Sequence, residues 1–421
     1  MPEDAGAAAP TASPPEPTSA GRPVQDWRGL LAIYVIVALV ESAGVSQVFA
    51  FLPLRLEQLG LPPRDVASFT GIFTALIFVA GVFLVPFWGV WADKFSRRAV
   101  IARSAVVEAV VFAGVALAAQ PWQLAAALLL TGLQLGNTGV MLAALRDVSP
   151  IRRVGTVTAI FGAAGPIGFA IGPAAGGVMV DKFHLPLVTV FWIASALSVA
   201  MVGLLLLGSR EVRPEVVPRG RAVELALGAV RGALGDPSIR RVFVIFGIAI
   251  LGSLMTRPYL PILVQGITGP GLGLASGIGL VVGTAALIGA LVSPLAGPLG
   301  DRLGFRPVLI GALVVGGLAV APMPLAASLA SLTGLAIVYG AAIAAVQAMV
   351  FSLLAIEVPP ERRSATLNLV LLPLYVAGIV GPSAAAGLAA TVGVPAIYPL
   401  AGGIMIAGAV IISGLTRRSD R

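Results

Sequence analysis

Twelve apolar blocks follow one another along this chain, each about long enough for an α-helix to cross a bilayer. They lie at roughly 30–52, 66–90, 99–119, 122–145, 155–180 and 187–207, and after a polar stretch at 241–264, 275–298, 307–328, 332–356, 364–389 and 395–415. A chain with this pattern needs lipid around most of its length. We therefore predict an all-α membrane protein with twelve transmembrane helices.

The low charge content supports the same conclusion. Of the 421 residues, 58% are hydrophobic and only 11% are charged, whereas about a quarter of the residues of a soluble domain are charged. We therefore expect the lipid bilayer as a partner. The chain has one histidine and no cysteine, so it lacks the side chains from which most transition-metal sites are built. We predict neither a metal nor a cofactor.

Polar segments divide the apolar blocks into two sets of six. The start of the chain is rich in Pro, Ala, Ser and Thr and has no apolar core of a signal peptide. The expected organisation is a disordered cytoplasmic tail (1–26), a six-helix bundle (27–208), a cytoplasmic central loop (209–240), a second six-helix bundle (241–416) and a short tail (417–421).

The basic residues gather on one side of the predicted helices. If both termini are cytoplasmic, all Lys and Arg residues except Arg55, Arg64, Lys182 and Arg257 fall on the cytoplasmic side. Arg103 is counted here with the basic group that follows the second block. This bias is typical of multi-pass proteins of the plasma membrane. It accounts for the net charge of +8 without a nucleic-acid partner.

The two halves of the chain repeat each other. Four short motifs recur in the same order at offsets of 208 to 210 residues: Phe51-Leu-Pro with Tyr259-Leu-Pro, Gly89-x-x-x-Asp93 with Gly297-x-x-x-Asp301, Pro150-Ile-Arg-Arg with Pro360-Glu-Arg-Arg, and Gly172-Pro173 with Gly381-Pro382. Two parallel copies of six helices suit a transporter that binds its substrate between the halves, near the bilayer midplane.

The loop after the second block resembles the signature loop of the major facilitator superfamily, Gly-x-x-x-Asp-Arg/Lys-x-Gly-Arg-Arg/Lys. It reads Gly89-Val-Trp-Ala-Asp93-Lys-Phe-Ser-Arg97-Arg98, with Ser96 at the usual glycine, and the second half repeats it as Gly297-Pro-Leu-Gly-Asp301-Arg302-Leu-Gly-Phe-Arg306. The resemblance implies two pseudo-symmetric six-helix bundles and transport of a small molecule by alternating access. We expect a monomer.

The chemistry of these loops indicates packing and gating. Gly89 allows two helices to approach closely, and Asp93 suits the positive N-terminal end of a neighbouring helix. Arg97 and Arg98 can bridge to acidic partners when the cytoplasmic side is closed. The alternative, topogenic charge alone, does not explain the Gly-to-Asp spacing. We assign the gating role to Gly89, Asp93, Arg97, Arg98, Gly297, Asp301, Arg302 and Arg306.

The fifth block resembles a motif of the drug/proton antiporter branch of this superfamily. It contains Gly172-Pro173-Ala-Ala-Gly176-Gly177, where small residues permit tight helix contact. The resemblance implies proton-coupled multidrug efflux across a bacterial inner membrane. The fourth block departs from that branch, because it lacks the arginine that is linked there to proton coupling.

Two carboxyl groups lie inside the apolar blocks. An ionised carboxylate is costly in the bilayer, so Glu41 and Glu108 need a cavity or a partner. The resemblance implies that the first, fourth, seventh and tenth helices line the cavity, which makes Glu41 a group that alternately binds a proton or a cationic substrate. Glu108, on a peripheral helix, can instead pair with a polar residue of the second or fourth helix.

Other polar residues in or near the blocks are candidate substrate contacts, although each can equally join one helix to another. They are Gln47, Gln134, Asn137, Arg257, Gln347 and Asn368. An enzyme is excluded, because no nucleophile or metal set accompanies the two glutamates, and no phosphate-binding loop for ATP is present.

These observations predict a secondary transporter for proton-coupled efflux of small amphipathic or cationic compounds. One alternative is a carrier of a defined metabolite such as a sugar, which needs more hydrogen-bonding groups in the cavity helices. Another is a non-transporting receptor or scaffold of the same fold, which has no need of both signature loops.

The predicted topology can be tested directly in this cysteine-free chain. Single cysteines introduced between Ser209 and Arg240 should be inaccessible to a membrane-impermeant thiol reagent added to intact cells, and accessible after permeabilisation. Labelling of that loop from outside intact cells would overturn the orientation.

Overall fold

The computed structural model describes residues 26–214, 217, 219–269, 271, 273–357, 369 and 371–417. The predicted tail 1–26, apart from Asp26, lies outside the described residues, as do Asn368 and positions 418–421. Within these described residues, twelve helices are long and apolar enough to cross a membrane. They confirm the predicted all-α class and the number of spans.

The first half contains α1 (Trp27–Gln58), α2 (Pro63–Lys94), α3 (Arg97–Leu117), α4 (Pro121–Leu130), α5 (Asn137–Val148), α6 (Val154–Asp181) and α7 (Leu187–Gly208). The second contains α9 (Pro237–Thr256), α10 (Leu260–Thr268), α11 (Leu274–Leu303), α12 (Phe305–Val320), α13 (Leu329–Glu357), α15 (Leu372–Thr391) and α16 (Ile397–Arg417). In each half two short helices share one span, α4 with α5 and α9 with α10.

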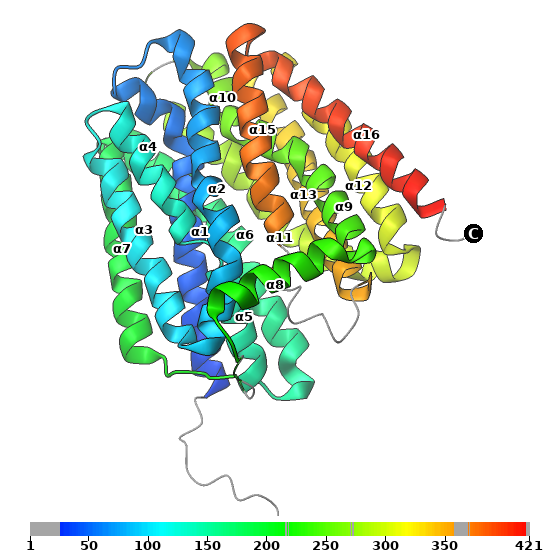
Figure 1. Ribbon diagram of the computed structural model, residues 1–421. Helices are drawn as coiled ribbons and strands as arrows, with labels where there is room; N and C mark the ends of the chain where they lie inside the picture. Colours follow the sequence, from blue (N-terminus) through cyan, green and yellow to red (C-terminus); the bar gives the residue numbers. More distant parts are fainter. Residues whose placement is uncertain are drawn as a thin grey trace, which may run out of the picture.

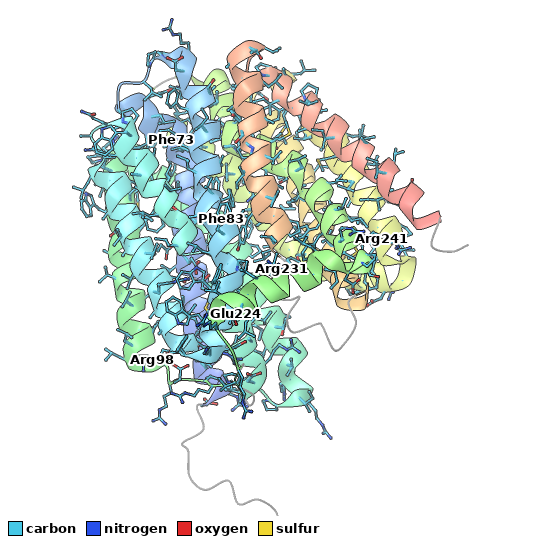
Figure 2. All side chains as sticks on the ribbon, in the orientation of Figure 1. Phe73, Phe83, Arg98, Glu224, Arg231 and Arg241 are labelled. Atoms are coloured by element: carbon cyan, nitrogen blue, oxygen red, sulfur yellow. The ribbon has the colours of Figure 1, made fainter. Side chains whose placement is uncertain are left out.

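The two halves lie side by side in Figure 1, joined by α8 (Ala222–Gly235), which runs across the lower part of the molecule toward α9. This helix falls within the predicted central loop and packs against α2 and α9. We call the side of α8, where α1 begins, the terminal face, and the other side the opposite face. The labelled charged side chains in Figure 2 gather toward the terminal face: Arg98, Glu224, Arg231 and Arg241.

Local sequence explains where several helices begin. The Asp26 carboxylate accepts a hydrogen bond from the Arg28 N–H, so α1 starts at Trp27. The Ser96 hydroxyl accepts one from the Ala99 N–H at 2.9 Å and caps α3. Ser96 stands where the superfamily signature has glycine, and in this chain it supplies a helix cap.

Glycines on α6 and α11 bring the two halves into backbone contact. A Cβ atom added at Gly177 would collide with the carbonyl oxygen of Ala275 on α11, and one added at Gly279 would lie 2.5 Å from the Pro173 carbonyl oxygen. The Ser276 hydroxyl donates to the Gly177 carbonyl at 3.2 Å, which fixes the same contact. The halves are therefore packed together toward the opposite face.

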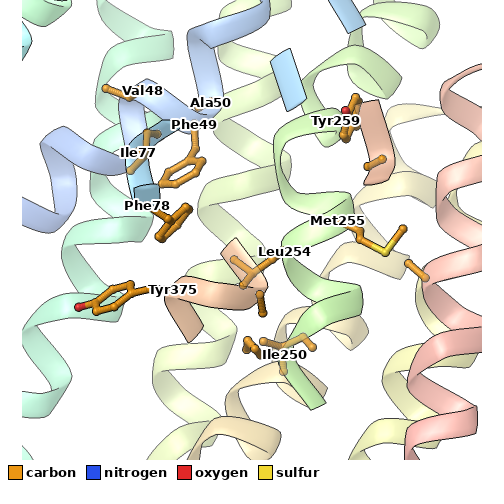
Figure 3. Close-up of a cluster of buried hydrophobic side chains, with 14 of the residues drawn as sticks. Val48, Phe49, Ala50, Ile77, Phe78, Ile250, Leu254, Met255, Tyr259 and Tyr375 are labelled. Carbon is orange, nitrogen blue, oxygen red and sulfur yellow. The ribbon is translucent and has the colours of Figure 1, made fainter. Parts of the chain in front are cut away.

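Other contacts close the same side. The Ser276 N–H donates to the Asp181 carboxylate at 2.5 Å, and the Gln265 amide donates to Glu57 at 3.0 Å. Deeper in the molecule, aromatic rings form a layer across the halves (Figure 3): the Phe49 and Phe78 centroids are 6.5 Å apart, and those of Phe78 and Tyr375 are 6.2 Å apart. This structure is thus closed toward the opposite face.

The α6–α11 contact predicts a conformational effect of Gly177→Ala. The added methyl group must push Ala275 away, and overpacking costs about 1–3 kcal/mol, so the closed opposite face should lose population. A cysteine at Leu260, which lines a cavity between the two halves, should react faster with an impermeant maleimide supplied from the opposite face.

Gly162→Ala is the matched control for this experiment. It makes the same change in the same helix, but a Cβ atom there meets open space. Its labelling rate should stay close to that of the parent Leu260→Cys protein. Equal rates in the two alanine variants would mean that the glycine contact does not hold the opposite face closed.

Candidate functional site

The Glu41 carboxylate lies at the centre of a polar cluster within the first half. Its Oε1 accepts a hydrogen bond from the Gln134 amide at 3.0 Å, and its Oε2 accepts one from the Asn137 amide at 2.7 Å. Three of the candidates from the sequence are thus brought together. Both amides lie at a break in the fourth span, between the 3₁₀ turn Thr131–Leu133 and the start of α5.

Gly136 explains this break. Its φ of 95° lies in the left-handed region that favours glycine, and the helix is interrupted beside it. The break frees the main-chain carbonyls of Gln134 and Leu135, which accept hydrogen bonds from the Arg103 guanidinium at 3.3 and 3.4 Å. The Ser104 hydroxyl also donates to the Gln134 carbonyl, at 3.1 Å.

Arg103 is the functional candidate that the sequence analysis missed. We counted it with the loop charges, but it lies inside α3, where its guanidinium carbon is 3.6 Å from the centroid of the Trp88 ring. It is close enough to interact electrostatically with Glu41. The available signal was an arginine within an apolar block and five residues before Glu108, because basic residues inside spans are rare and commonly functional.

Glu108 lies behind the cluster and is only 2% exposed. A Cβ atom added at Gly44 of α1 would collide with the Phe112 ring and lie 3.4 Å from the Glu108 Oε1, so the bare glycine makes room for the Phe112 ring of α3. Glu41 and the Ser198 hydroxyl of α7 lie near Glu108, but Ser198 donates to the Ala194 carbonyl at 3.0 Å, and the Glu108 Oε1 has no hydrogen-bond partner among the described residues. The expected partner on the second or fourth helix is likewise not found in the described part of the chain, where α3 packs against α7.

A separate cavity of about 320 Å³ lies between the two halves. Its walls come from α1, α6, α9, α10, α11 and α13, that is, from spans one, five, seven, eight and ten. Arg257 and Gln347 line it, as does Ser42, whereas Glu41, Gln134 and Asn137 do not. The expectations that Glu41 and the fourth span line the central cavity therefore fail here. The reason is that α6 packs against both α1 and α11 and forms that wall.

Gln47 joins two helices. Its amide donates to the Gly172 carbonyl of α6 at 3.2 Å, and the residue is buried. The whole motif Gly172, Pro173, Gly176 and Gly177 is buried too, with Gly172 against α1 and Gly177 against α11. This stretch is a packing surface on two sides of α6.

The first signature loop forms a network of ion pairs and hydrogen bonds at the terminal face. The Arg97 side chain is 5% exposed and binds two carboxylates, Asp93 at 3.0 Å and Asp147 at 2.6 Å. Glu211, in the segment after α7, accepts hydrogen bonds from the Arg97 N–H at 2.9 Å and from the Ser96 hydroxyl. The loop thereby ties α2, α3, α5 and the start of the central segment together.

The remaining signature residues lie in different surroundings. Gly89 is buried in α2, and Arg98 donates to main-chain carbonyls at the end of α7. In the second copy Asp301 and Arg302 are exposed, and Arg306 is partly buried. A Cβ atom added at Gly297 would meet open space.

The described part of the chain contains twelve helices long and apolar enough to span a membrane, in two halves with a cavity between them, which is the architecture of a polytopic membrane transporter. A family model described as Major Facilitator Superfamily matches residues 30–278 and 242–421. The chain belongs to this superfamily, and it is a secondary transporter and not an enzyme.

Relatives with assigned names cover nearly the whole chain. The chain is 26% identical over 395 residues to the multidrug resistance protein MdtG of Citrobacter koseri, covering 93% of this chain and 96% of that protein. It is 27% identical over 398 residues to MdtG of Salmonella paratyphi A, with the same coverage of 93% and 96%. These similarities are distant but extend over both halves.

Solved structures show the same fold at lower identity. The nucleoside transporter NupG superposes with a TM-score of 0.74 and 18% identity, covering 91% of this chain and 99% of its own. The human organic anion transporter MFSD10 superposes with a TM-score of 0.68 and 19% identity, covering 92% and 99%. Because both identities are so low, these likenesses establish the architecture alone.

Proposed function

We propose that this protein exports small amphipathic compounds in exchange for protons, by alternating access. The observation that carries the proposal is the Glu41 cluster. A carboxyl group near the middle of a span is held by two amides and faces an arginine that also lies within a span. Intramembrane groups of this kind mark proton relays and ion pathways in transporters.

The cluster suits reversible proton binding. The ionised carboxylate can accept from Gln134 and Asn137 and attract Arg103, and a proton on Glu41 removes that attraction. Glu41 belongs to α1, whereas its amide partners belong to the broken fourth span. Loading and unloading of the proton therefore changes how α1 is held against that span. Glu108, which interacts with Glu41, is a second candidate acceptor.

The cavity supports amphipathic substrates. Its walls are mostly Ala, Gly, Val, Ile and Phe, with a few polar groups, as in sites that bury drug-sized ligands. A sugar carrier needs more hydrogen-bonding groups than this lining provides. The relatives named multidrug resistance proteins agree with efflux of more than one compound. A carrier of one defined metabolite remains the alternative.

The location and the gate belong to the same proposal. We place the protein as a monomer in a bacterial plasma membrane, with the terminal face in the cytoplasm, because the basic residues gather there. In the closed-outside state described above, Arg97 binds Asp93 and Asp147 of its own half. We assign to this network the control of closure at the terminal face.

Asp93→Asn should slow turnover more than it weakens substrate binding. It removes one charge from the Arg97 pair and leaves the distant cavity intact. Because the Asp93 side chain is 29% exposed, we expect its ion pair with Arg97 to lose about 1–2 kcal/mol of interaction energy. This corresponds to a decrease of roughly 5–30-fold in the maximal transport rate. Initial rates in vesicles over a range of substrate concentrations separate the two effects. Asp301→Asn, at an exposed position, should be milder, and a collapse of substrate affinity in Asp93→Asn would contradict the gating role.

Glu41→Gln should abolish export driven by a pH gradient while the protein remains folded and inserted. Glutamine keeps the volume and can still bind Asn137, but it cannot cycle a proton. The measurement is export from proteoliposomes with an imposed pH gradient. Glu224→Gln makes the same chemical change on α8, where the side chain is 66% exposed, and should retain wild-type export.

The expected order among the carboxyl groups is Glu41→Gln most severe, Glu108→Gln milder and Glu224→Gln silent. Wild-type rates and undiminished proton counterflow in Glu41→Gln would remove this residue from the mechanism. Coupling would then have to reside on Glu108, or transport would be uncoupled.

A further inference from the structure

Arg257 is the one charged side chain among the described residues that line the central cavity. The other polar groups in the lining are hydroxyls and one amide, contributed by Ser42, Ser253, Ser293, Tyr339 and Gln347. No Asp or Glu belongs to the described part of this lining. The described lining therefore presents a single positive charge to whatever enters the cavity.

The backbone explains why this arginine faces the cavity. Arg257 begins the 3₁₀ turn Arg257–Tyr259, at the point where α9 gives way to α10 within the seventh span. The turn contains Pro258, which cannot donate a main-chain hydrogen bond and interrupts the helix. The guanidinium carbon of Arg257 lies 5.0 Å from the centroid of the Phe169 ring, and Phe169 lines the part of the cavity wall that α6 forms.

The other arginines inside the fold have partners that Arg257 lacks. Arg97 binds two carboxylates, Arg55 donates to three main-chain carbonyls near the end of α3, and Arg103 donates to two carbonyls beside Glu41. For Arg257 the structure gives a contact with the face of the Phe169 ring, and no carboxylate among the described residues pairs with it.

A positive charge in an apolar cavity is costly until an opposite charge meets it. The groups around Arg257 can complete an anion site. The Tyr339 hydroxyl, which lies 3.0 Å from the Thr256 hydroxyl oxygen, and the Ser253 hydroxyl share the lining with Arg257. The apolar walls, among them Ile343, offer contact to a hydrocarbon or aromatic body.

We propose that Arg257 binds an acidic group of the substrate, so that the compounds carried in this cavity are organic anions with an apolar body. This rests on the proposed export function and narrows its substrate class. It also gives the two charged residues different roles. Arg257 recognises the anionic substrate in the cavity between the halves. Glu41 lies outside this cavity and is therefore not the binding partner of a cationic substrate in it.

The test is equilibrium binding to the purified full-length protein in lipid nanodiscs, with empty nanodiscs subtracted. The probes are dansylate, a fluorescent naphthalene sulfonate; dansylamide, its uncharged sulfonamide; and a dansylamide that carries a quaternary ammonium group. They share one ring system and differ in charge. Wild-type protein should bind dansylate most tightly and the cationic probe most weakly.

Arg257→Gln should weaken dansylate binding by about tenfold or more, as expected for loss of a charge-assisted hydrogen bond, and should leave dansylamide almost unchanged. Arg257→Lys keeps the charge and should retain the preference for dansylate. Arg64→Gln removes an arginine whose side chain is 86% exposed, and it should alter neither probe.

Three results would overturn the proposal. They are a wild-type protein that binds dansylate no better than dansylamide, an Arg257→Gln variant with unchanged charge preference, and equal loss of both probes in a folded Arg257→Gln protein. If Arg257→Gln does not fold, the wild-type ranking and Arg257→Lys decide the question. The assay needs no pH gradient, so its failure is distinct from failure of proton-coupled export.

Discussion

The backbone contact along α6 is the constraint on which the rest of this structure depends. Through glycines on one side, α6 packs against α1. Through Gly177 and the Pro173 carbonyl it packs against α11 of the other half. One helix therefore joins both halves, forms a wall of the cavity and closes the opposite face. Because these contacts are between backbones, they tolerate small changes poorly. Such a contact favours two discrete arrangements of the helices over a continuous range of positions, as alternating access requires.

The sequence was sufficient for the features that depend on length, charge and repetition. Twelve apolar blocks, two copies of a signature loop and the bias of arginines predict the spans and the two halves, because lipid imposes those patterns on any multi-pass chain. It was insufficient for features that depend on where helices bend. The break at Gly136 brings Gln134 and Asn137 to Glu41, and apolar periodicity does not report a break. Arg103 was counted with the loop although it lies within the third apolar block, and only the structure shows its partners, which lie on other helices.

Two chemically different sites follow from this arrangement. The Glu41 cluster lies within the first half, where amides and Arg103 surround a carboxyl group, and the Arg257 cavity lies between the halves. The arginine linked to coupling in the antiporter branch is absent from the fourth span, yet Arg103 reaches the break in that span from α3. A proton and a substrate then need not compete for one side chain. They can be linked through the movement of α1 and α6, which pack against each other.

The central claim is that protonation changes which face of the protein is open. It is tested most directly by distances between paired spin labels in nanodiscs as the pH is varied. One pair, at Arg64 and Val392, spans the opposite face, and the other, at Arg152 and Leu303, spans the terminal face; all four positions are exposed. The account predicts that one distance lengthens while the other shortens across the titration. Distances that do not respond to pH, or that change in parallel, would contradict it.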